Sequence, residues 1–212
     1  MLTDLWPLLD LRLTTPRLEL RLPDEGQLAA LARLAAAGIH PPDRQPFLRP
    51  WATEPAARAR SVVQYHWLRR GNWHPADWSL TLAVLADGEV VGQQALYAQD
   101  FGVLRAVQST SWLGLAHQGK GIGTEMRAAV LHLAFDGLGA TEALSGARVD
   151  NPGSLAVSRK LGYREDGLQR DLVDGAPVTT RRLRLSRADW AARERLPVTV
   201  GGLAPCLPLF GL

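Results

Sequence analysis

A glycine-rich segment at residues 118–124 contains the residues best suited to bind an anion. It reads Gln-Gly-Lys-Gly-Ile-Gly-Thr and lies between an apolar, strand-like run at residues 107–115 and a helix-like run at residues 124–135. Glycines at such a junction let backbone N–H groups point outward at the positive end of a helix dipole. Such N–H groups bind phosphate oxygens. We therefore expect a phosphate or pyrophosphate site here.

Two common nucleotide motifs do not fit this segment. The P-loop requires Ser or Thr directly after its lysine, whereas Lys120 is followed by Gly121. The dinucleotide fingerprint G-x-G-x-x-G needs one residue more than the stretch from Gly119 to Gly123 provides. What remains is the spacing Q-x-x-G-x-G, formed by Gln118, Gly121 and Gly123. Taken alone, so short a pattern fits a purely structural glycine turn equally well.

A second pattern lies further along the chain. Residues 151–154 read Asn-Pro-Gly-Ser, and residues 155–163 continue as Leu-Ala-Val-Ser-Arg-Lys-Leu-Gly-Tyr. Together the two patterns resemble the pyrophosphate loop and the N-x-x-S/A, K-L-G-F/Y signature of the GNAT (GCN5-related N-acetyltransferase) superfamily, whose members bind coenzyme A. The resemblance covers about residues 15–190. It is closest to the ribosomal-protein N-acetyltransferase (RimJ/RimL)-like branch, and within it to an actinobacterial group that includes a mycobacterial succinyltransferase.

The resemblance implies that the chain binds acetyl-CoA or succinyl-CoA as acyl donor. In this fold two adjacent strands splay apart where the loop begins, and the pantetheine arm pairs with the exposed backbone. A backbone N–H near Gly114 or Leu115 then suits the oxyanion. The implied cofactor-binding residues are Leu113, Leu115, Gln118, Gly119, Lys120, Gly121, Ile122, Gly123, Thr124, Asn151, Ser158 and Lys160.

The reaction implied is direct attack of a primary amine on the thioester within a ternary complex. We expect Ser154 to be the acid that protonates the thiolate, with Ser158 as second candidate and Asn151 as a positioning residue. The structural alternatives are a helix N-cap for Ser154 and a turn residue for Asn151.

No carboxylate stands where related enzymes often carry a glutamate base, because Gln108 lies near that place. Among the remaining groups, His40, His66 and Asp150 are conceivable bases, and each could equally be an ordinary surface or core residue.

The acceptor site is expected on the first two helices and the proline-rich connection between them. This segment contributes the predicted substrate-binding residues Arg44, Phe47, Arg49, Trp51 and His66. Aromatic and arginine side chains make good contact surfaces, and arginine near the acyl pocket favours succinyl over acetyl. For each tryptophan alone, a core position is the alternative. The acceptor is a small-molecule or peptide amine, and the rival hypothesis is a non-catalytic acyl-CoA-binding regulatory module.

Composition limits the other possibilities. The chain has 212 residues, a net charge of +3 and 46% hydrophobic residues, which suits one globular domain spanning residues 1–212. The charge fits an anionic cofactor and does not by itself indicate nucleic acid. With one cysteine, Cys206, and neither a signal-peptide pattern nor a membrane-spanning run, we expect a cytoplasmic protein without membrane contact. We predict no metal, and a homodimer is possible by resemblance.

Periodicity predicts the elements that position these residues. We expect strands at residues 16–22, 78–86, 89–97, 103–115 and 143–149, a final hairpin of residues 163–168 and 179–186, and helices at residues 24–37, 54–70, 121–135 and 154–161. This order predicts an α/β fold, with helices on both faces of a mixed, mostly antiparallel twisted sheet. The core spans about residues 15–190, and an apolar extension at residues 191–212 packs on the body or on a second subunit.

Overall fold

The computed structural model describes residues 1–41, 46–48 and 51–212, and these residues form one nine-stranded sheet. The strand order is β7-β8-β6-β5-β4-β3-β2-β1-β9, and all neighbours pair antiparallel except β5 and β6. The predicted mixed, mostly antiparallel sheet is confirmed. The strands are β1 Arg12–Thr14, β2 Leu18–Arg21, β3 Asp77–Ala86, β4 Glu89–Gln99, β5 Ala106–Leu113, β6 Glu142–Arg148, β7 Arg164–Val173, β8 Ala176–Ser186 and β9 Thr199–Gly201.

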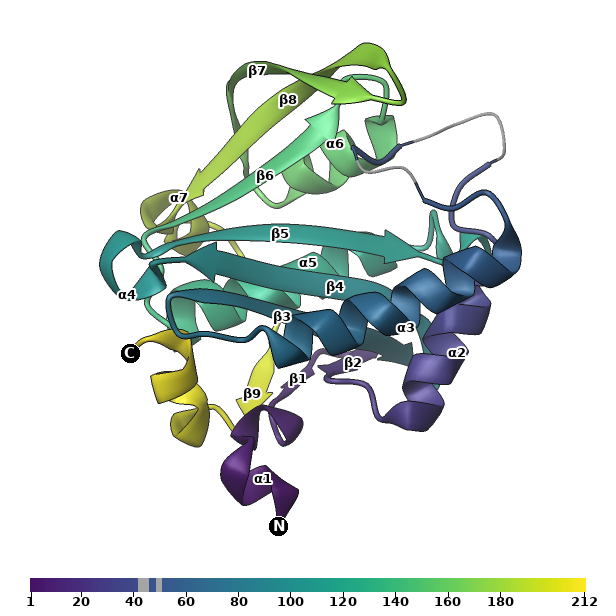
Figure 1. Cartoon of the computed structure of the whole chain (residues 1–212). Coiled ribbons are helices and arrows are strands. Elements are labelled where there is room, and N and C mark those ends of the chain that lie inside the picture. Colours follow the sequence, from purple (N-terminus) through teal and green to yellow (C-terminus); the bar gives the residue numbers. More distant parts are fainter. Residues whose placement is uncertain (42–45, 49–50) are drawn as a thin grey trace.

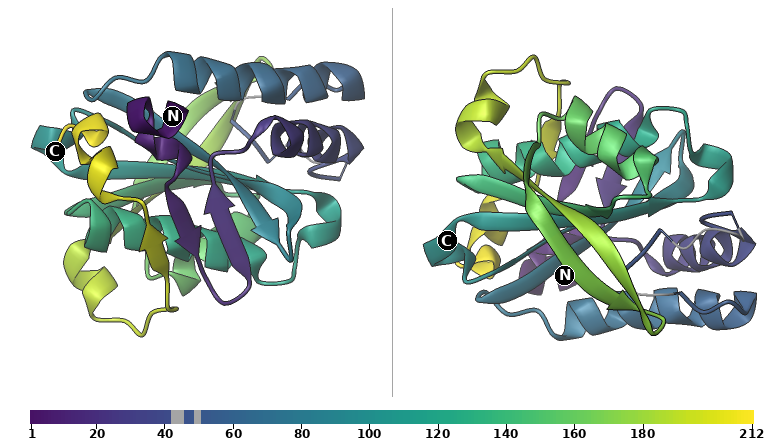
Figure 2. Two further views of the ribbon diagram at one scale, coloured as in Figure 1. Left: turned by 90° about the horizontal axis from the view of Figure 1, so that it is seen from below. Right: turned by 90° about the horizontal axis from the view of Figure 1, so that it is seen from above.

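Helices cover both faces of this sheet (Figures 1 and 2). One face carries α2 (Glu25–Ala37) and α3 (Pro55–Gly71), and the other carries α5 (Ile122–His132) and α6 (Pro152–Lys160). The helix after the glycine loop changes at its end into a π turn, Leu133–Gly137. The remaining short helices are α1 Leu2–Leu5, η1 Pro7–Leu9, α4 Phe101–Leu104, η2 Leu115–His117, α7 Arg187–Ala191 and η4 Ala204–Phe210.

Capping and an apolar stripe explain α2. The Asp24 carboxylate accepts a hydrogen bond from the Gln27 backbone N–H at 2.8 Å, which satisfies one of the unpaired first-turn donors. The buried stripe follows the helical repeat and consists of Leu28, Leu31, Ala32 and Ala35. It packs with Trp112 of β5 in a core cluster separate from the larger one under α5. The predicted helix at residues 24–37 is therefore confirmed.

Turn residues set the two predicted hairpins. Asp87 and Gly88 have φ of 50° and 80°, and Asp174 and Gly175 have φ of 50° and 78°. Both pairs lie in the left-handed region that a type I′ turn needs. The hairpins β3–β4 and β7–β8 therefore confirm the predictions, although β7 and β8 extend further toward their turn than predicted.

The predicted strand at residues 103–115 is shorter in the structure. The chain first forms α4, which Asp100 and Arg105 flank in left-handed conformations with φ of 47° and 50°. Phe101 of α4 is fully buried, so core packing holds this turn in place of an extended segment. Strand β5 consequently begins at Ala106.

The C-terminal segment belongs to the body of the chain. Strand β9 pairs with β1, and the side chains of Cys206 and Phe210 in η4 are fully buried. The Trp73 indole N–H donates to the Leu209 carbonyl at 2.8 Å. Packing on the body, the first of the two predicted alternatives for this apolar segment, is confirmed.

The sheet opens between β5 and β6. These parallel strands pair only over residues 106–108 and 142–144. Beyond that point β5 stays on β4 as far as Leu113, while β6 stays on β8 as far as Arg148. Figure 1 shows the two strands diverging. The gap between them, called the β5–β6 gap below, ends at the glycine-rich loop.

Candidate active site

The glycine-rich loop presents a row of unpaired backbone donors. Gly119 and Gly121 have φ of 74° and 83°, and Gly121 is the N-cap of α5 with no side-chain capping bond. The backbone N–H groups of residues 119–123 donate to no acceptor in the described part of the chain. A Cβ added to Gly123 would make only ordinary contacts, at 3.7 Å or more. The protein itself thus leaves space beside five N–H groups, which suits an approaching anion.

Gln118 holds this loop in place. Its side-chain amide donates to the carbonyls of Ile39 at 2.8 Å and Leu113 at 3.0 Å. The first bond reaches the segment after α2, and the second reaches the end of β5. The Gln118 side chain therefore fixes the loop between two elements, which is a structural reason for glutamine at this position of the motif.

Arg17 and Glu125 support the loop from the other side, and sequence reasoning did not identify them. The Arg17 guanidinium donates to the Lys120 carbonyl at 3.2 Å and to the Glu125 carboxylate at 2.7 Å. Glu125 is buried and also accepts from the Thr15 hydroxyl at 2.7 Å. A glutamate on the buried side of a helix was the available signal, because buried carboxylates require partners.

The backbone of β5 faces the β5–β6 gap through its odd-numbered residues. Leu113 pairs opposite Gly92, and the Gly114 N–H donates to the Val91 carbonyl at 3.1 Å. Because successive residues in a strand alternate, the N–H and C=O groups of Ser111 and Leu113 point toward the gap. The sheet leaves them without β6 as a partner beyond residue 108. The predicted backbone role of Leu113 therefore has the required geometry.

The predicted N–H donors at Gly114 and Leu115 do not face the β5–β6 gap. The Gly114 N–H is bonded to Val91, and the Leu115 N–H donates to the Gly38 carbonyl at 3.2 Å. Residues 115–117 form a short 3-10 turn, which redirects the backbone away from the gap. The expectation for these two amides was wrong, and Leu113 supplies the N–H that faces the gap.

Asn151 and Ser154 lie at the start of α6, directly after β6. The Asn151 side-chain oxygen accepts from the Ser154 backbone N–H at 3.1 Å, so Asn151 is the N-cap. The alternative of Ser154 as cap is therefore wrong. The Ser154 hydroxyl is half-buried and has no partner in the described part of the chain. Lys160 lies exposed at the opposite end of this helix.

Ser158, the second predicted acid candidate, is buried in the structure. It has no exposed surface, and its hydroxyl accepts a hydrogen bond from Arg127 at 2.9 Å. Arg127 lies on α5 and is 5% exposed. Burial raises the pKa of the neighbouring Tyr163, so this phenol stays neutral. Arginine within an apolar helix was the signal for this cluster, and sequence reasoning missed it.

A row of aromatic rings, formed by His40, Phe47, Trp51 and Trp112, lines the face of β5 that carries α2 and α3. Ring centroids are 5.9 Å apart for His40 and Phe47, 5.6 Å for Phe47 and Trp51, and 5.5 Å for Trp51 and Trp112. Phe47 and Trp51 thus lie on the predicted acceptor side and also pack against the core. The other two predicted contacts there, Arg44 and Arg49, lie outside the described residues.

His40 is the ring at the end of this row opposite to Trp112. Its Nδ1 lies 2.8 Å from the Pro41 carbonyl. A carbonyl oxygen only accepts, so Nδ1 is the donor, and in the neutral ring the lone pair then lies on Nε2. His40 also directly follows Ile39, which anchors Gln118. The structure therefore places a possible base near both the loop and the acceptor face.

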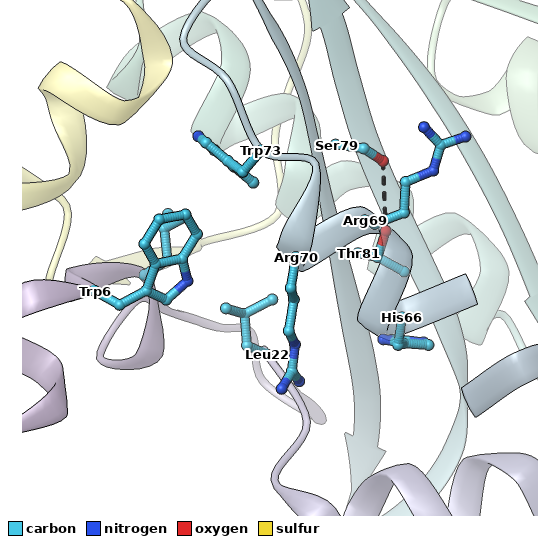
Figure 3. A pocket seen from close by; sticks show the side chains of 9 residues that line it. Trp6, Leu22, His66, Arg69, Arg70, Trp73, Ser79 and Thr81 are labelled. Carbon is cyan, nitrogen blue, oxygen red and sulfur yellow. Dashed lines mark hydrogen bonds between the residues drawn. The ribbon is translucent and has the colours of Figure 1, made fainter. Parts of the chain in front are cut away.

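His66 does not contact the acceptor face. It is 1% exposed, and its Nε2 lies 2.9 Å from the Gln93 side-chain oxygen. Burial lowers its pKa to about 4. Figure 3 shows the cavity of about 10 Å³ that it lines together with Trp6, Leu8, Leu22, Arg69, Arg70, Trp73, Ser79 and Thr81. The predicted substrate-binding role is wrong because the folded chain encloses the ring.

Asp150 carries a bidentate ion pair. Its two carboxylate oxygens accept from the Arg148 guanidinium at 2.9 and 2.7 Å. A paired carboxylate is a weak base, so His40 is the strongest of the three predicted candidates.

Two further findings concern the described residues as a group. They contain no cluster of three or more His, Cys, Asp or Glu side chains that could hold a metal ion. Within the same residues, no helix combines the length and apolar character that crossing a membrane requires.

A sheet that opens between parallel strands, beside an uncapped helix N-terminus, is an arrangement that suits an extended anionic ligand. A family model described as an acetyltransferase (GNAT) domain matches residues 17–164. The chain belongs to this family.

Solved structures share the fold. Mycobacterium smegmatis RimJ in complex with CoA-disulfide is 23% identical, with a TM-score of 0.69 over 89% of this chain and 92% of that chain. RimL, a ribosomal L7/L12 alpha-N-protein acetyltransferase in complex with coenzyme A, is 20% identical, with a TM-score of 0.64 over 81% and 95%. A chimera of Vibrio cholerae spermidine N-acetyltransferase SpeG and hSSAT is 16% identical, with a TM-score of 0.65 over 84% and 99%.

Proposed function

We propose that this protein transfers an acyl group from coenzyme A to a primary amine by direct attack. The amine nitrogen forms a bond to the thioester carbon, the C–S bond breaks, and the electron pair leaves with sulfur. The amine proton goes first to a base and finally to the thiolate, so the products are an amide and a thiol. The observation that carries the proposal is the row of five unpaired N–H groups at residues 119–123, at the mouth of the β5–β6 gap.

Three groups of this chain suit the three chemical tasks. The Leu113 N–H points into the gap and is fixed by the β4–β5 pairing, which suits oxyanion stabilisation. The Ser154 hydroxyl is placed by the Asn151 cap and can donate a hydrogen bond to the leaving sulfur. His40 offers Nε2 as a base on the acceptor side.

The base role of His40 has a direct test. We expect His40→Ala to lower kcat about a hundredfold at neutral pH. The KM for acyl-CoA should stay unchanged, since the ring belongs to the acceptor side. The loss should shrink at high pH, where the amine arrives deprotonated. Unchanged kcat would contradict the assignment.

We propose acetyl or succinyl as the acyl group. The sequence resemblance to an actinobacterial group with a succinyltransferase supports succinyl, as do Arg44 and Arg49 in the acceptor segment. Turnover of acetyl-CoA and succinyl-CoA by wild type, Arg44→Ala and Arg49→Ala decides between them. A selective loss of succinyl transfer in the variants supports the proposal. Equal use of both donors, unchanged by either substitution, contradicts a succinyl-specific role.

The acceptor we propose is a peptide N-terminus or a small amine, in a cytoplasmic, single-domain protein that can form homodimers. The named neighbours act on a ribosomal protein and on spermidine, and both acceptors are amines. Thiol release with a panel of peptides and polyamines tests the proposal. Amine-dependent release supports it. Binding of acyl-CoA without release under every condition would instead support the non-catalytic regulatory module.

A further inference from the structure

One side chain holds the middle of the glycine-rich loop. Three residues of the segment 118–124 are glycines, which do not fix a backbone conformation by themselves. Gln118 anchors the start of the loop, and the first turn of α5 anchors its end. Between these anchors, Gly119 and Lys120 make a single hydrogen bond with the described part of the chain. The Lys120 carbonyl accepts it from the Arg17 guanidinium at 3.2 Å. The conformation of the loop therefore depends on Arg17.

Arg17 is itself held by Glu125 of α5. Its Nε and one terminal nitrogen lie 2.7 and 2.5 Å from Glu125 Oε2. The other oxygen of this carboxylate accepts from the Arg17 backbone N–H at 3.1 Å and from the Thr15 hydroxyl at 2.7 Å. A planar guanidinium that is bound through two nitrogens has a fixed orientation. These contacts form one rigid connection from α5 through Glu125 and Arg17 to the Lys120 carbonyl.

This connection determines the direction of a donor in the loop. The C=O and N–H groups of a trans peptide point in opposite directions. The peptide between Lys120 and Gly121 turns its C=O toward Arg17, so the Gly121 N–H points away from Arg17. That N–H has no acceptor in the described part of the chain, and it lies at the N-cap of α5. Arg17 therefore fixes a peptide plane whose unpaired N–H lies at the positive end of the helix dipole.

Charge offers a different explanation for the same arginine. Glu125 lies in the first turn of α5, where its carboxylate repels an anion bound at the helix N-terminus. Arg17 cancels that charge, because its guanidinium pairs with the carboxylate. The two explanations predict different results once the charge of Glu125 is removed as well. A role in charge becomes unnecessary in that case, whereas a role in holding the Lys120 carbonyl does not.

We propose that Arg17 is a positioning residue that sets the affinity for the diphosphate of coenzyme A by holding the Lys120 carbonyl. This inference rests on the proposed function. Arg17 acts through the backbone of the loop, on the side opposite to the Gly121 N–H. Without this arginine, the ligand must order a glycine-rich segment when it binds, which costs conformational entropy.

Binding calorimetry with coenzyme A tests this inference. We expect Arg17→Met to weaken binding at least about tenfold. Arg17→Lys should recover part of the loss, because its ammonium group can still donate to the Lys120 carbonyl. The matched control is Arg21→Met, since Arg21 on β2 pairs with Glu19 at 3.2 Å and is not bonded to the loop. This control should bind as wild type does. An unchanged affinity in Arg17→Met would overturn the inference.

A double variant separates position from charge. In Arg17→Met/Glu125→Gln the charge of Glu125 is absent and the Lys120 carbonyl is still not held, so affinity should stay as low as in Arg17→Met. Recovery of wild-type affinity would show that Arg17 only cancels a charge, which overturns the positioning role.

Steady-state kinetics gives a further distinction. Arg17→Met should raise the KM for acyl-CoA and leave kcat at saturating acyl-CoA unchanged, because the loop contacts the diphosphate and not the thioester. An equal fall in kcat would indicate a damaged fold and contradict the inference. If wild type binds no coenzyme A, the proposed function itself fails. Binding by wild type with no loss in Arg17→Met would overturn this inference alone.

Discussion

At the scale of single residues, two buried charges on α5 contrast with each other. Glu125 accepts hydrogen bonds from Thr15 and Arg17, whereas Arg127 has a single bond, to a neutral hydroxyl. The first arrangement stabilises the fold, because a paired buried carboxylate holds the turn between β1 and β2 against the helix. The second adds a desolvated charge without compensation. Their positions on one helix turn make them a matched pair for mutation.

We predict opposite effects of neutralising these two residues. Arg127→Met should leave the free energy of unfolding unchanged or raise it by about 1 kcal/mol, since an uncompensated charge is replaced by an apolar side chain. Glu125→Gln should lower it by about 1–2 kcal/mol, since charge-assisted hydrogen bonds are lost. Urea denaturation measures both values. A loss of several kcal/mol in Arg127→Met would show that the arginine stabilises the fold.

Ser154 supports a prediction about catalysis. Its hydroxyl has no structural partner in the described part of the chain, and its backbone N–H alone serves the Asn151 cap. Ser154→Ala should therefore keep the helix and lower kcat about tenfold or more, with KM for acyl-CoA unchanged. The matched variant Asn151→Ala should instead destabilise α6 by about 1 kcal/mol. Steady-state kinetics with thermal melting separates these effects. Unchanged kcat in Ser154→Ala would remove Ser154 from the mechanism.

His66 predicts a pH dependence of stability. Its folded-state pKa of about 4 lies below the unfolded value of 6.5. Between these values the unfolded chain binds a proton that the folded chain excludes, so stability falls as pH drops from 6.5 toward 4. The loss amounts to about 3 kcal/mol. Comparing wild type with His66→Gln at several pH values isolates it. Parallel stability curves for the two proteins would contradict the prediction.

At the scale of elements, the site depends on the divergence of β5 and β6. Strand β5 follows β4 to Leu113, and β6 follows β8 to Arg148, so each strand is fixed by its other neighbour. The backbone facing the gap and the N–H row at residues 119–123 therefore remain exposed in a rigid frame. The donors are thus oriented before a ligand arrives, which lowers the cost of binding.

Hydrogen exchange should report this arrangement. Adding coenzyme A should slow amide exchange at residues 119–123 and at Leu113, whose N–H groups gain acceptors. The outer part of the β7–β8 hairpin, where Leu168 to Val173 pair with Arg181 to Ala176, serves as an internal control and should not change. Protection confined to other segments would show that the ligand binds elsewhere.

At the scale of the whole molecule, the long periodic elements and the loop were predictable from sequence. The Asp87-Gly88 turn signal between two apolar runs identified β3 and β4, and the Asp24 cap marked the start of α2. The three-residue strands β1 and β9 were not predicted, because so few residues show no alternation and depend on pairing with distant segments.

The features of the site also separate into those that local sequence predicts and those that depend on contacts between distant segments. The start of the helix after residue 150 was predicted from local sequence, although Ser154 was named as its N-cap in place of Asn151. The partners of Glu125, the enclosure of His66 and the contact of Arg127 with Ser158 join residues far apart in the chain. Spacing identifies a loop, but only the packed fold shows which side chains meet.

Direct binding of coenzyme A to wild type, Gly123→Glu and Gly71→Glu tests the central claim. Gly123 lies in the N–H row, where a carboxylate would occupy and repel the pyrophosphate site, whereas a Cβ at Gly71 meets open space at the end of α3. We predict that calorimetry shows binding to wild type and Gly71→Glu, and at least a hundredfold weaker binding to Gly123→Glu. Equal affinity in all three proteins would contradict the account.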